Sequence, residues 1–208
     1  DLALFGRRSF TFGATLALAY FAGFTGVFFI YAQFLQDGMG YTALQSGLAS
    51  TPFALGSAVA AGLGGQVVTR IGRRLVAAGL VLVIVGLLAA WVAIGLVDSA
   101  AVGYAVAAPF LVAGLGSGLV IAPNQTLSLS EVPPRQGGAA GGVLQTGQRI
   151  GSAAGIAAVG SLFYSRLAGT GGDFGVAVRD GFLLIVAFVV VALAIAIADL
   201  VVERRAQP

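Results

Sequence analysis

The stretch from 64 to 74 reads GGQVVTRIGRR and places three arginines in a glycine-flanked turn between two long uncharged segments. A helix needs roughly 20 apolar residues to cross a bilayer core of about 30 Å, and each flanking segment is that long. The turn therefore indicates a point where two membrane-spanning helices are joined outside the bilayer.

The spacing of charges along the rest of the chain repeats this pattern. The chain has 208 residues, of which 58% are hydrophobic and 9% charged, whereas soluble proteins carry about 25% charged residues. We expect an all-α integral membrane protein in which residues 1–208 form one six-helix transmembrane bundle. The predicted helices lie at about 10–36, 44–68, 75–97, 101–127, 138–164 and 181–202, and the longest predicted loop is a glycine-rich one at 165–179.

The arginines sort by side once six helices are drawn. One side has Arg166 and Arg179, and the other has Arg7, Arg8, Arg70, Arg73, Arg74, Arg135, Arg204 and Arg205. Cytoplasmic loops carry the excess of basic residues in membrane proteins. We therefore expect a multi-pass protein of the cell membrane with both ends of this chain in the cytoplasm. This placement explains the net charge of +3 without nucleic acid as a partner.

Polar side chains follow a period of three helices. The third and sixth predicted helices contain no Ser, Thr, Asn or Gln over 75–97 and 181–198, whereas the other four contain them. Polar groups inside a membrane must face protein or water. The pattern predicts two three-helix repeats, and an odd number of helices per repeat makes the second inverted relative to the first.

The turn also resembles a known family signature. The spacing Gly65-x-x-x-Thr69-Arg70-x-Gly72-Arg73-Arg74 is similar to the cytoplasmic motif of the major facilitator superfamily, which has an acidic residue where this chain has Thr69. The stretches FLQDGMGYTALQSGLASTPFALG (34–56), GLGSGLVIAP (114–123) and GGVLQTGQRIGSAAGIA (141–157) resemble the fourteen-helix drug:proton antiporters of that superfamily. The resemblance runs from about residue 1 to 203.

This resemblance implies the C-terminal half of a secondary active transporter, with a missing N-terminal half as its partner. It further implies proton-coupled efflux of hydrophobic or cationic small molecules by alternating access. The first and fourth helices would line the cavity, the second and fifth would meet the other half, and the third and sixth would face lipid. A charge relay that needs the carboxylate replaced by Thr69 is not expected.

The arginines of the turn have two interpretations. They form a gate if Arg70, Arg73 and Arg74 latch onto a neighbouring helix or the other half in one conformational state. They form a simple topology anchor if they pair with the helix dipole or with lipid phosphate. Glycines such as Gly65 and Gly72 permit the tight turn in either case.

Arg149 lies about fifteen residues past Pro134, hence roughly 20 Å along the fifth helix. Burying a guanidinium in a bilayer costs about 2.5–3.5 kcal/mol, so a partner is expected. That partner is a carboxylate of the missing half, an anionic substrate, or the headgroup zone reached by snorkelling. Gln145 and Gln148 project near Arg149 and predict a polar stripe toward the substrate pathway, with buried glutamine packing as the alternative.

Small residues and prolines predict contact or bending points in the helices. The residues are Gly147, Gly151 and Gly155 in the fifth helix, Gly114, Gly116 and Gly118 in the fourth, and Pro52 in the second. A glycine ridge at spacing four permits close helix contact and sliding. The closely spaced glycines and the proline allow either bending or close packing.

The first helix is rich in aromatic residues. Phe21, Phe24, Phe28 and Tyr31 share one face and suit hydrophobic or cationic drugs through stacking and cation–π contacts. Packing inside the bundle is the alternative interpretation. Gln33 follows near the external end and is a further candidate for the pathway.

Other functional classes find little support in the composition. The chain has no histidine and no cysteine, and no pair of carboxylates falls near the bilayer midplane, so neither an enzyme nor a metal or cofactor site is expected. Any proton carrier would lie mainly in the missing half. A six-helix channel of the aquaporin type would need two Asn-Pro-Ala turns, whereas residues 122–124 read APN once. A self-associating half-transporter stays open as an alternative.

Overall fold

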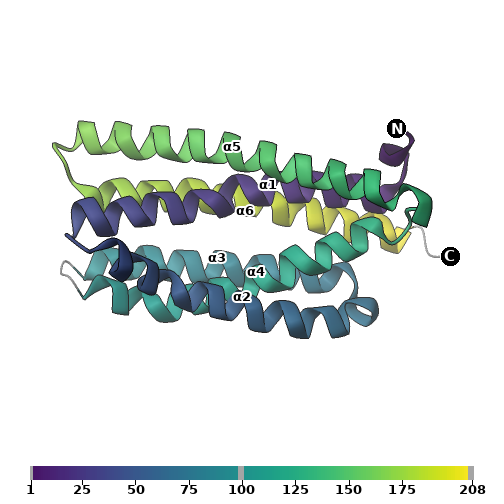
Figure 1. Ribbon diagram of the computed structural model, residues 1–208, viewed down its shortest axis with the longest axis horizontal. Coiled ribbons are helices and arrows are strands. Elements are labelled where there is room, and N and C mark those ends of the chain that lie inside the picture. Colours follow the sequence, from purple (N-terminus) through teal and green to yellow (C-terminus); the bar gives the residue numbers. More distant parts are fainter. Residues whose placement is uncertain (1, 98–100, 206–208) are drawn as a thin grey trace.

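Six α-helices make up the described part of the protein, which comprises residues 2–97 and 101–205 of a computed structural model. The helices run along one long axis (Figure 1). Their bounds are α1 Arg8–Gln33, α2 Ala43–Ile71, α3 Arg73–Leu96, α4 Val102–Leu129, α5 Gly137–Gly169 and α6 Phe174–Arg205. A π-helical turn, Phe34–Gly38, extends α1. Short 3-10 turns, Leu2–Gly6 and Pro134–Gln136, precede α1 and α5. The six predicted helices are confirmed.

Five of these helices are long and apolar enough to cross a membrane, namely α1, α2, α3, α4 and α6. Among these five, α1 is the most enclosed within the bundle and α2 the most exposed. Helix α5 is 33 residues long, but its many glycines together with Gln145, Gln148 and Arg149 lower its hydropathy. The most polar helix is therefore one of the two that the family resemblance implies would meet the other half of a transporter.

The helices form two layers, with α1, α5 and α6 in one and α2, α3 and α4 in the other (Figure 1). Each layer combines the first helix of one triplet with the second and third helices of the other triplet. Exchanging α1 with α4, α2 with α5 and α3 with α6 maps the main helix pairings onto themselves. This is the arrangement expected of two inverted three-helix repeats.

The hydrophobic core lies between the layers and is rich in aromatic rings. Tyr31 of α1 and Phe110 of α4 are fully buried, with ring centroids 4.6 Å apart. Phe182 of α6 joins them at 6.4 Å from Phe110. The two central helices α1 and α4 are thereby joined to an outer helix at one level of the bundle.

The three glycines of α4 are packing residues in this structure. A β-carbon at Gly114 would overlap the carbonyl of Phe53 in α2, and one at Gly118 would overlap the carbonyl of Ser57. Gly116 faces the other way, where its β-carbon would lie 2.5 Å from the carbonyl oxygen of Gly79 in α3. Helix α4 therefore lies at backbone contact distance from both of its layer partners. Bending at these positions stays a prediction.

Helix α6 begins at Phe174, so the predicted loop at 165–179 is wrong. Only residues 170–173 connect α5 to α6. The Asp173 carboxylate accepts a hydrogen bond from the Val176 amide at 2.9 Å and so caps the start of α6. Two of the charged residues in the predicted loop region, Arg179 and Asp180, have partners on neighbouring helices. Arg179 lies over the Trp91 ring of α3 at 4.2 Å, and Asp180 forms an ion pair with Arg166 at 2.8 Å.

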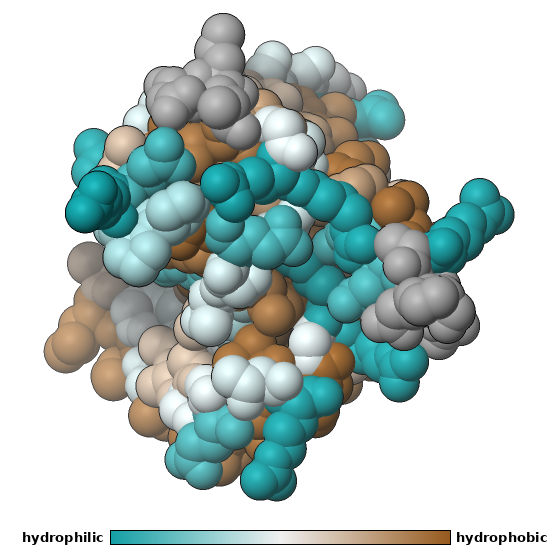
Figure 2. All heavy atoms as spheres, turned by 90° about the vertical axis from the view of Figure 1, so that its right-hand side faces the viewer, coloured by the Kyte–Doolittle hydropathy of each residue, from teal (hydrophilic) through white to brown (hydrophobic). Residues whose placement is uncertain are grey.

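The basic residues gather at the end of the bundle that carries both termini. This end, which we call the arginine end, contains the start of α1, α3 and α5 and the finish of α2, α4 and α6. Figure 2 views it directly and shows hydrophilic side chains across its middle with hydrophobic ones around them. The predicted sorting of arginines by side follows from this arrangement of helices.

Candidate functional site

The α2–α3 turn reverses the chain at a single residue. Gly72 has φ = 62° and ψ = −143°, a backbone conformation that residues other than glycine rarely adopt. Its amide donates to the Val68 carbonyl at 2.8 Å and ends α2, and α3 begins at the next residue. Arg73 is therefore the first residue of α3, and its side chain is buried.

The three predicted gate arginines separate into two environments. Arg70 and Arg74 are exposed, as are Gly65 and Thr69, whereas Arg73 is only 6% exposed. A β-carbon at Gly65 would meet open space, so this glycine is not required for packing within the chain. Among the described residues, Arg73 forms hydrogen bonds and an ion pair with other helices, whereas Arg70 and Arg74 form none.

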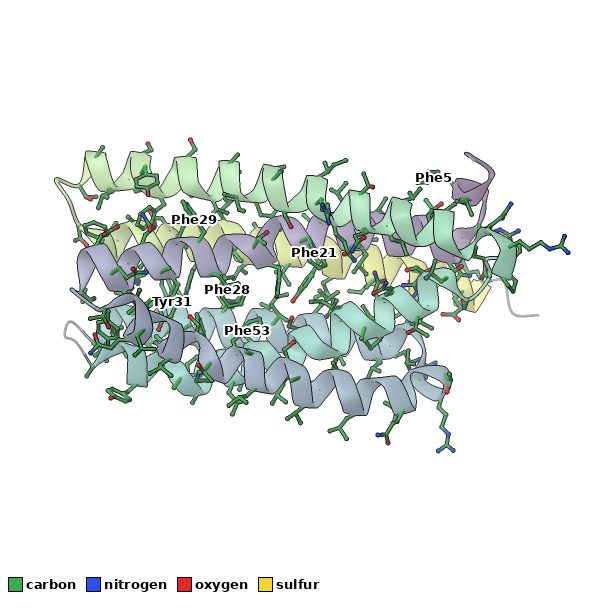
Figure 3. All side chains as sticks on the ribbon, viewed as in Figure 1. Phe5, Phe21, Phe28, Phe29, Tyr31 and Phe53 are labelled. Atoms are coloured by element: carbon green, nitrogen blue, oxygen red, sulfur yellow. The ribbon has the colours of Figure 1, made fainter. Side chains whose placement is uncertain are left out.

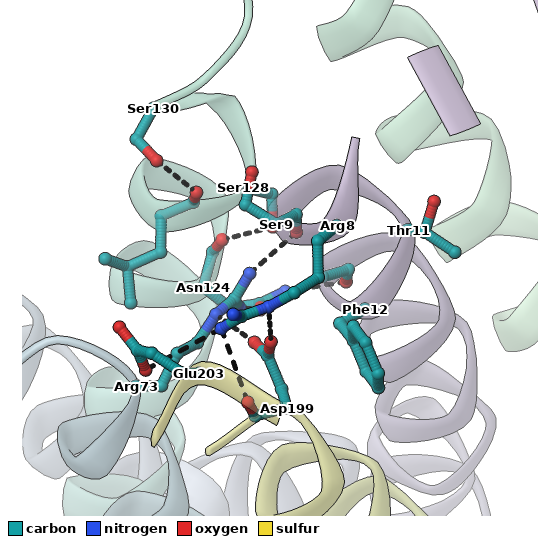
Figure 4. A network of polar contacts seen from close by, with 12 residues as sticks. Arg8, Ser9, Thr11, Phe12, Arg73, Asn124, Ser128, Ser130, Asp199 and Glu203 are labelled. Carbon is teal, nitrogen blue, oxygen red and sulfur yellow. Dashed lines mark hydrogen bonds and ion pairs between the residues drawn. The ribbon is translucent and has the colours of Figure 1, made fainter. Parts of the chain in front are cut away.

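The guanidinium of Arg73 contacts three other helices through its three nitrogens (Figure 4). Its Nε lies 2.7 Å from Asp199 Oδ2 of α6, and its Nη1 donates to Asn124 Oδ1 of α4 at 2.6 Å. Its Nη2 donates to the Ser9 carbonyl of α1 at 2.7 Å. A buried arginine with every nitrogen engaged fixes the relative positions of the groups it binds.

Asp199 is the centre of this arrangement and is 1% exposed. Its second oxygen, Oδ1, accepts from Arg8 Nε of α1 at 2.9 Å, so two arginines share one carboxylate. Arg8 also approaches Glu203 at 3.8 Å on the more exposed side. We call Arg8, Arg73, Asn124 and Asp199 the charge network. Burying ions is costly, and close pairing offsets that cost only where the groups are well hydrogen-bonded, as all three nitrogens of Arg73 and both oxygens of Asp199 are.

Small residues allow the helices to come together around the charge network. The Asn124 amide donates to the Gly13 carbonyl at 3.0 Å, which ties α4 to α1 a second time. A β-carbon at Gly13 would overlap the hydroxyl of Ser128, which itself donates to the Asn124 carbonyl at 2.6 Å. The guanidinium of Arg7 also donates to the Glu131 carbonyl after α4.

Arg8, Asn124 and Asp199 are functional candidates that the sequence prediction missed. Asp199 follows an uncharged run of eighteen residues, 181–198, and Asn124 is the only asparagine in the chain. Polar groups at such positions in membrane helices are expected to have partners. That signal identifies each residue singly, but their convergence on Arg73 follows from helix packing between distant parts of the chain.

The polar stripe on α5 points away from the core. Gln145 and Arg149 are exposed and Gln148 is half-buried. On another face of the helix, Gly151 and Gly155 lie against the α1 carbonyls of Leu18 and Ala22. Gly147 faces open space, so only two of the three ridge glycines contact α1. The pathway role of the stripe stays a prediction.

The predicted aromatic face of α1 is divided between surface and core (Figure 3). Phe21, Phe24 and Phe28 are half-buried, and Phe28 meets Phe53 of α2 edge-to-face with centroids 5.1 Å apart. Tyr31 lies inside the core instead. At the opposite end from the arginines, the Gln33 amide donates to the Tyr164 hydroxyl of α5 at 2.7 Å. Pro52 is half-buried within a continuous α2.

Comparison with known proteins identifies the family. Residues 2–156 match the family described as Major Facilitator Superfamily. The chain belongs to the major facilitator superfamily. Its six helices in two inverted repeats are half of the major facilitator fold, and members of the superfamily are transporters and not, in general, enzymes. The protein is accordingly a multi-pass membrane protein.

Several similar proteins are named as transporters, export proteins or resistance proteins. The probable actinorhodin transporter of Streptomyces coelicolor is 32% identical over 80% of this chain and 29% of its own length. The multidrug resistance protein Stp of Mycobacterium tuberculosis is 34% identical over 82% of this chain and 31% of its own length. The cephamycin export protein CmcT of Amycolatopsis lactamdurans is 30% identical over 98% of this chain and 41% of its own length. This chain therefore spans well under half the length of these relatives.

Proposed function

We propose that this chain is the C-terminal half of a secondary active transporter that exports hydrophobic or cationic small molecules. The observation that carries the proposal is the match, along four fifths of the chain or more, to relatives named for drug resistance and antibiotic export. Each relative has more than twice the length that the chain covers, which leaves room for a second bundle of similar size. The polar face of α5 and the exposed face of α2 are surfaces on which such a bundle would pack.

Alternating access in this proposal is a rocking of the two bundles around a central cavity. The charge network supports a rigid arginine end, because it ties α1, α3, α4 and α6 together through Arg73 and Asp199. The exposed Arg70 and Arg74 are left to contact the companion bundle or the lipid surface in one state. Arg73 thus has a structural task, and gating belongs to its two exposed neighbours.

Orientation in the membrane can be tested with single cysteines, because the native chain has none. We propose a cytoplasmic arginine end on the basis of its arginine excess. Thr69 and Thr170 are exposed at opposite ends. In intact cells, a membrane-impermeant maleimide should label Thr170→Cys and not Thr69→Cys, and permeabilisation should expose both. Labelling of Thr69→Cys alone in intact cells would reverse the assignment.

Proton coupling is the finer part of the proposal. Among the described residues, the fully buried carboxylate is Asp199, and two arginines already occupy it. We therefore place the proton carrier in the companion half. The test is transport of a cationic dye into inverted vesicles by the protein expressed from its whole reading frame. An imposed pH gradient, acid inside, should accelerate uptake several-fold. Equal rates with and without the gradient would remove proton coupling but leave the exporter class intact.

A further inference from the structure

A half-open pocket lies at the end of the bundle opposite the arginine end, outside both the charge network and the predicted pathway face. It has a volume of about 590 Å³ and is formed where the chain leaves the π-helical turn and where α2 and α4 begin. Sites for small organic ligands commonly have volumes of about 300–1,000 Å³. The pocket is therefore large enough for a drug-sized molecule.

The local structure holds the pocket wall in a fixed shape. Gly40, with φ = 72°, turns the chain so that Tyr41 reaches α4, and the Tyr41 hydroxyl accepts a hydrogen bond from the Gly103 amide at 3.3 Å. A β-carbon at Gly103 would lie 2.8 Å from that hydroxyl, so a larger residue there would displace the Tyr41 side chain. The π-helical turn just before this wall is a rare element that occurs frequently at functional sites.

The exposed side-chain amide of Gln45, which lines the pocket, has a donor that no described residue uses. The Gln45 side-chain oxygen accepts from the Thr42 amide at 2.9 Å, in a capping box that starts α2. This bond assigns the oxygen, so the other end of the amide is the Nε2 donor, and it has no hydrogen-bond partner within the described residues. A ligand in the pocket can receive this hydrogen bond through a carbonyl, ether or hydroxyl oxygen.

The remaining walls are aromatic and apolar. The ring of Tyr104 lines the pocket and is 86% exposed, while Leu48 and Ala107 supply an apolar surface. The described lining includes no charged side chain, so a bound anion would find no counterion there.

From these features we infer that the pocket binds planar aromatic compounds that are neutral or singly cationic and carry a hydrogen-bond acceptor. The inference rests on the proposed export function and adds a release-side subsite to it, at the end that the proposal places outside the cell. Tyr104 supplies a stacking and cation–π surface, and Gln45 supplies the donor.

The test uses rhodamine 6G, a planar cationic dye with an ester acceptor. Its binding to the protein expressed from its whole reading frame, in phosphatidylcholine nanodiscs, is measured by fluorescence polarisation, with empty nanodiscs subtracted. Tyr104→Ala should weaken saturable binding about five-fold, the size expected for one stacking contact. Tyr104→Phe should bind like the native chain, because the ring face is retained. Tyr164→Ala, at the same end but outside the pocket, should also leave binding unchanged.

A second pair of variants separates the pocket from general effects on folding. Ala107→Trp fills the pocket and should abolish saturable binding. Ala108 is exposed and lies outside the pocket lining, so Ala108→Trp should leave binding unchanged. Near-UV circular dichroism checks that both variants fold. Native-like binding by folded Ala107→Trp would overturn the inference. Loss of dye transport in the vesicle assay with binding intact would instead refute the export function and leave the subsite standing.

Discussion

Replacing Arg73 with alanine is expected to lower the free energy of unfolding by about 3–5 kcal/mol, the usual cost of leaving one partner of a buried ion pair alone. Asp199 would keep only Arg8, whose side chain is one-third exposed, and the Asn124 oxygen would lose its donor. The measurement is unfolding of the purified protein in mild detergent, followed by circular dichroism. Arg74→Ala, one residue away but exposed, should change stability by less than about 0.5 kcal/mol.

A double variant distinguishes pairing from simple loss of packing. Asp199→Leu alone should also be strongly destabilising, because Arg73 would then be a buried cation without a carboxylate. In Arg73→Met with Asp199→Leu both charges are gone, and the double variant should be at least about 2 kcal/mol more stable than the sum of the single effects predicts. Strict additivity of the two substitutions would show that the ion pair does not hold α3 to α6.

The helices could be predicted from the sequence because the bilayer sets their length. A run of about twenty uncharged residues has one stable conformation in lipid, so the spacing of charges locates each helix. The sequence predicts the start of α6 too late, because the charged pair Arg179 and Asp180 indicates residues outside a membrane helix. They lie within it, since Trp91 of α3 and Arg166 of α5 give them partners. Those partners come from distant helices that no local pattern identifies.

The partners of the arginines in the candidate site were also beyond the reach of a local sequence pattern. The motif predicts a turn with three arginines, but it cannot tell that Arg73 alone is buried. That difference depends on the helical register after Gly72 and on which residue of α6 lies opposite. The resemblance to a superfamily signature located the correct turn. The carboxylate that completes it, Asp199, follows 126 residues later and is brought there by the pairing of the repeats.

The second large effect is expected where α5 meets α1. A β-carbon at Gly155 would overlap the backbone carbonyl of Ala22, and backbone cannot rotate away as a side chain can. Gly155→Val should therefore force α5 from α1 and destabilise the protein by about 3 kcal/mol, at the upper end of ordinary overpacking. The same detergent unfolding assay measures it, and cross-linking of cysteines introduced in α1 and α5 reports whether the two helices separate.

Gly147 provides the matched control on the same helix. A β-carbon there meets nothing within 4 Å, so Gly147→Val should change stability by less than about 1 kcal/mol, with the better helix propensity of valine favouring the variant. Equal destabilisation by the two substitutions would show that adding a side chain to α5 has a general effect, and that the contact with Ala22 does not explain the loss of stability at position 155.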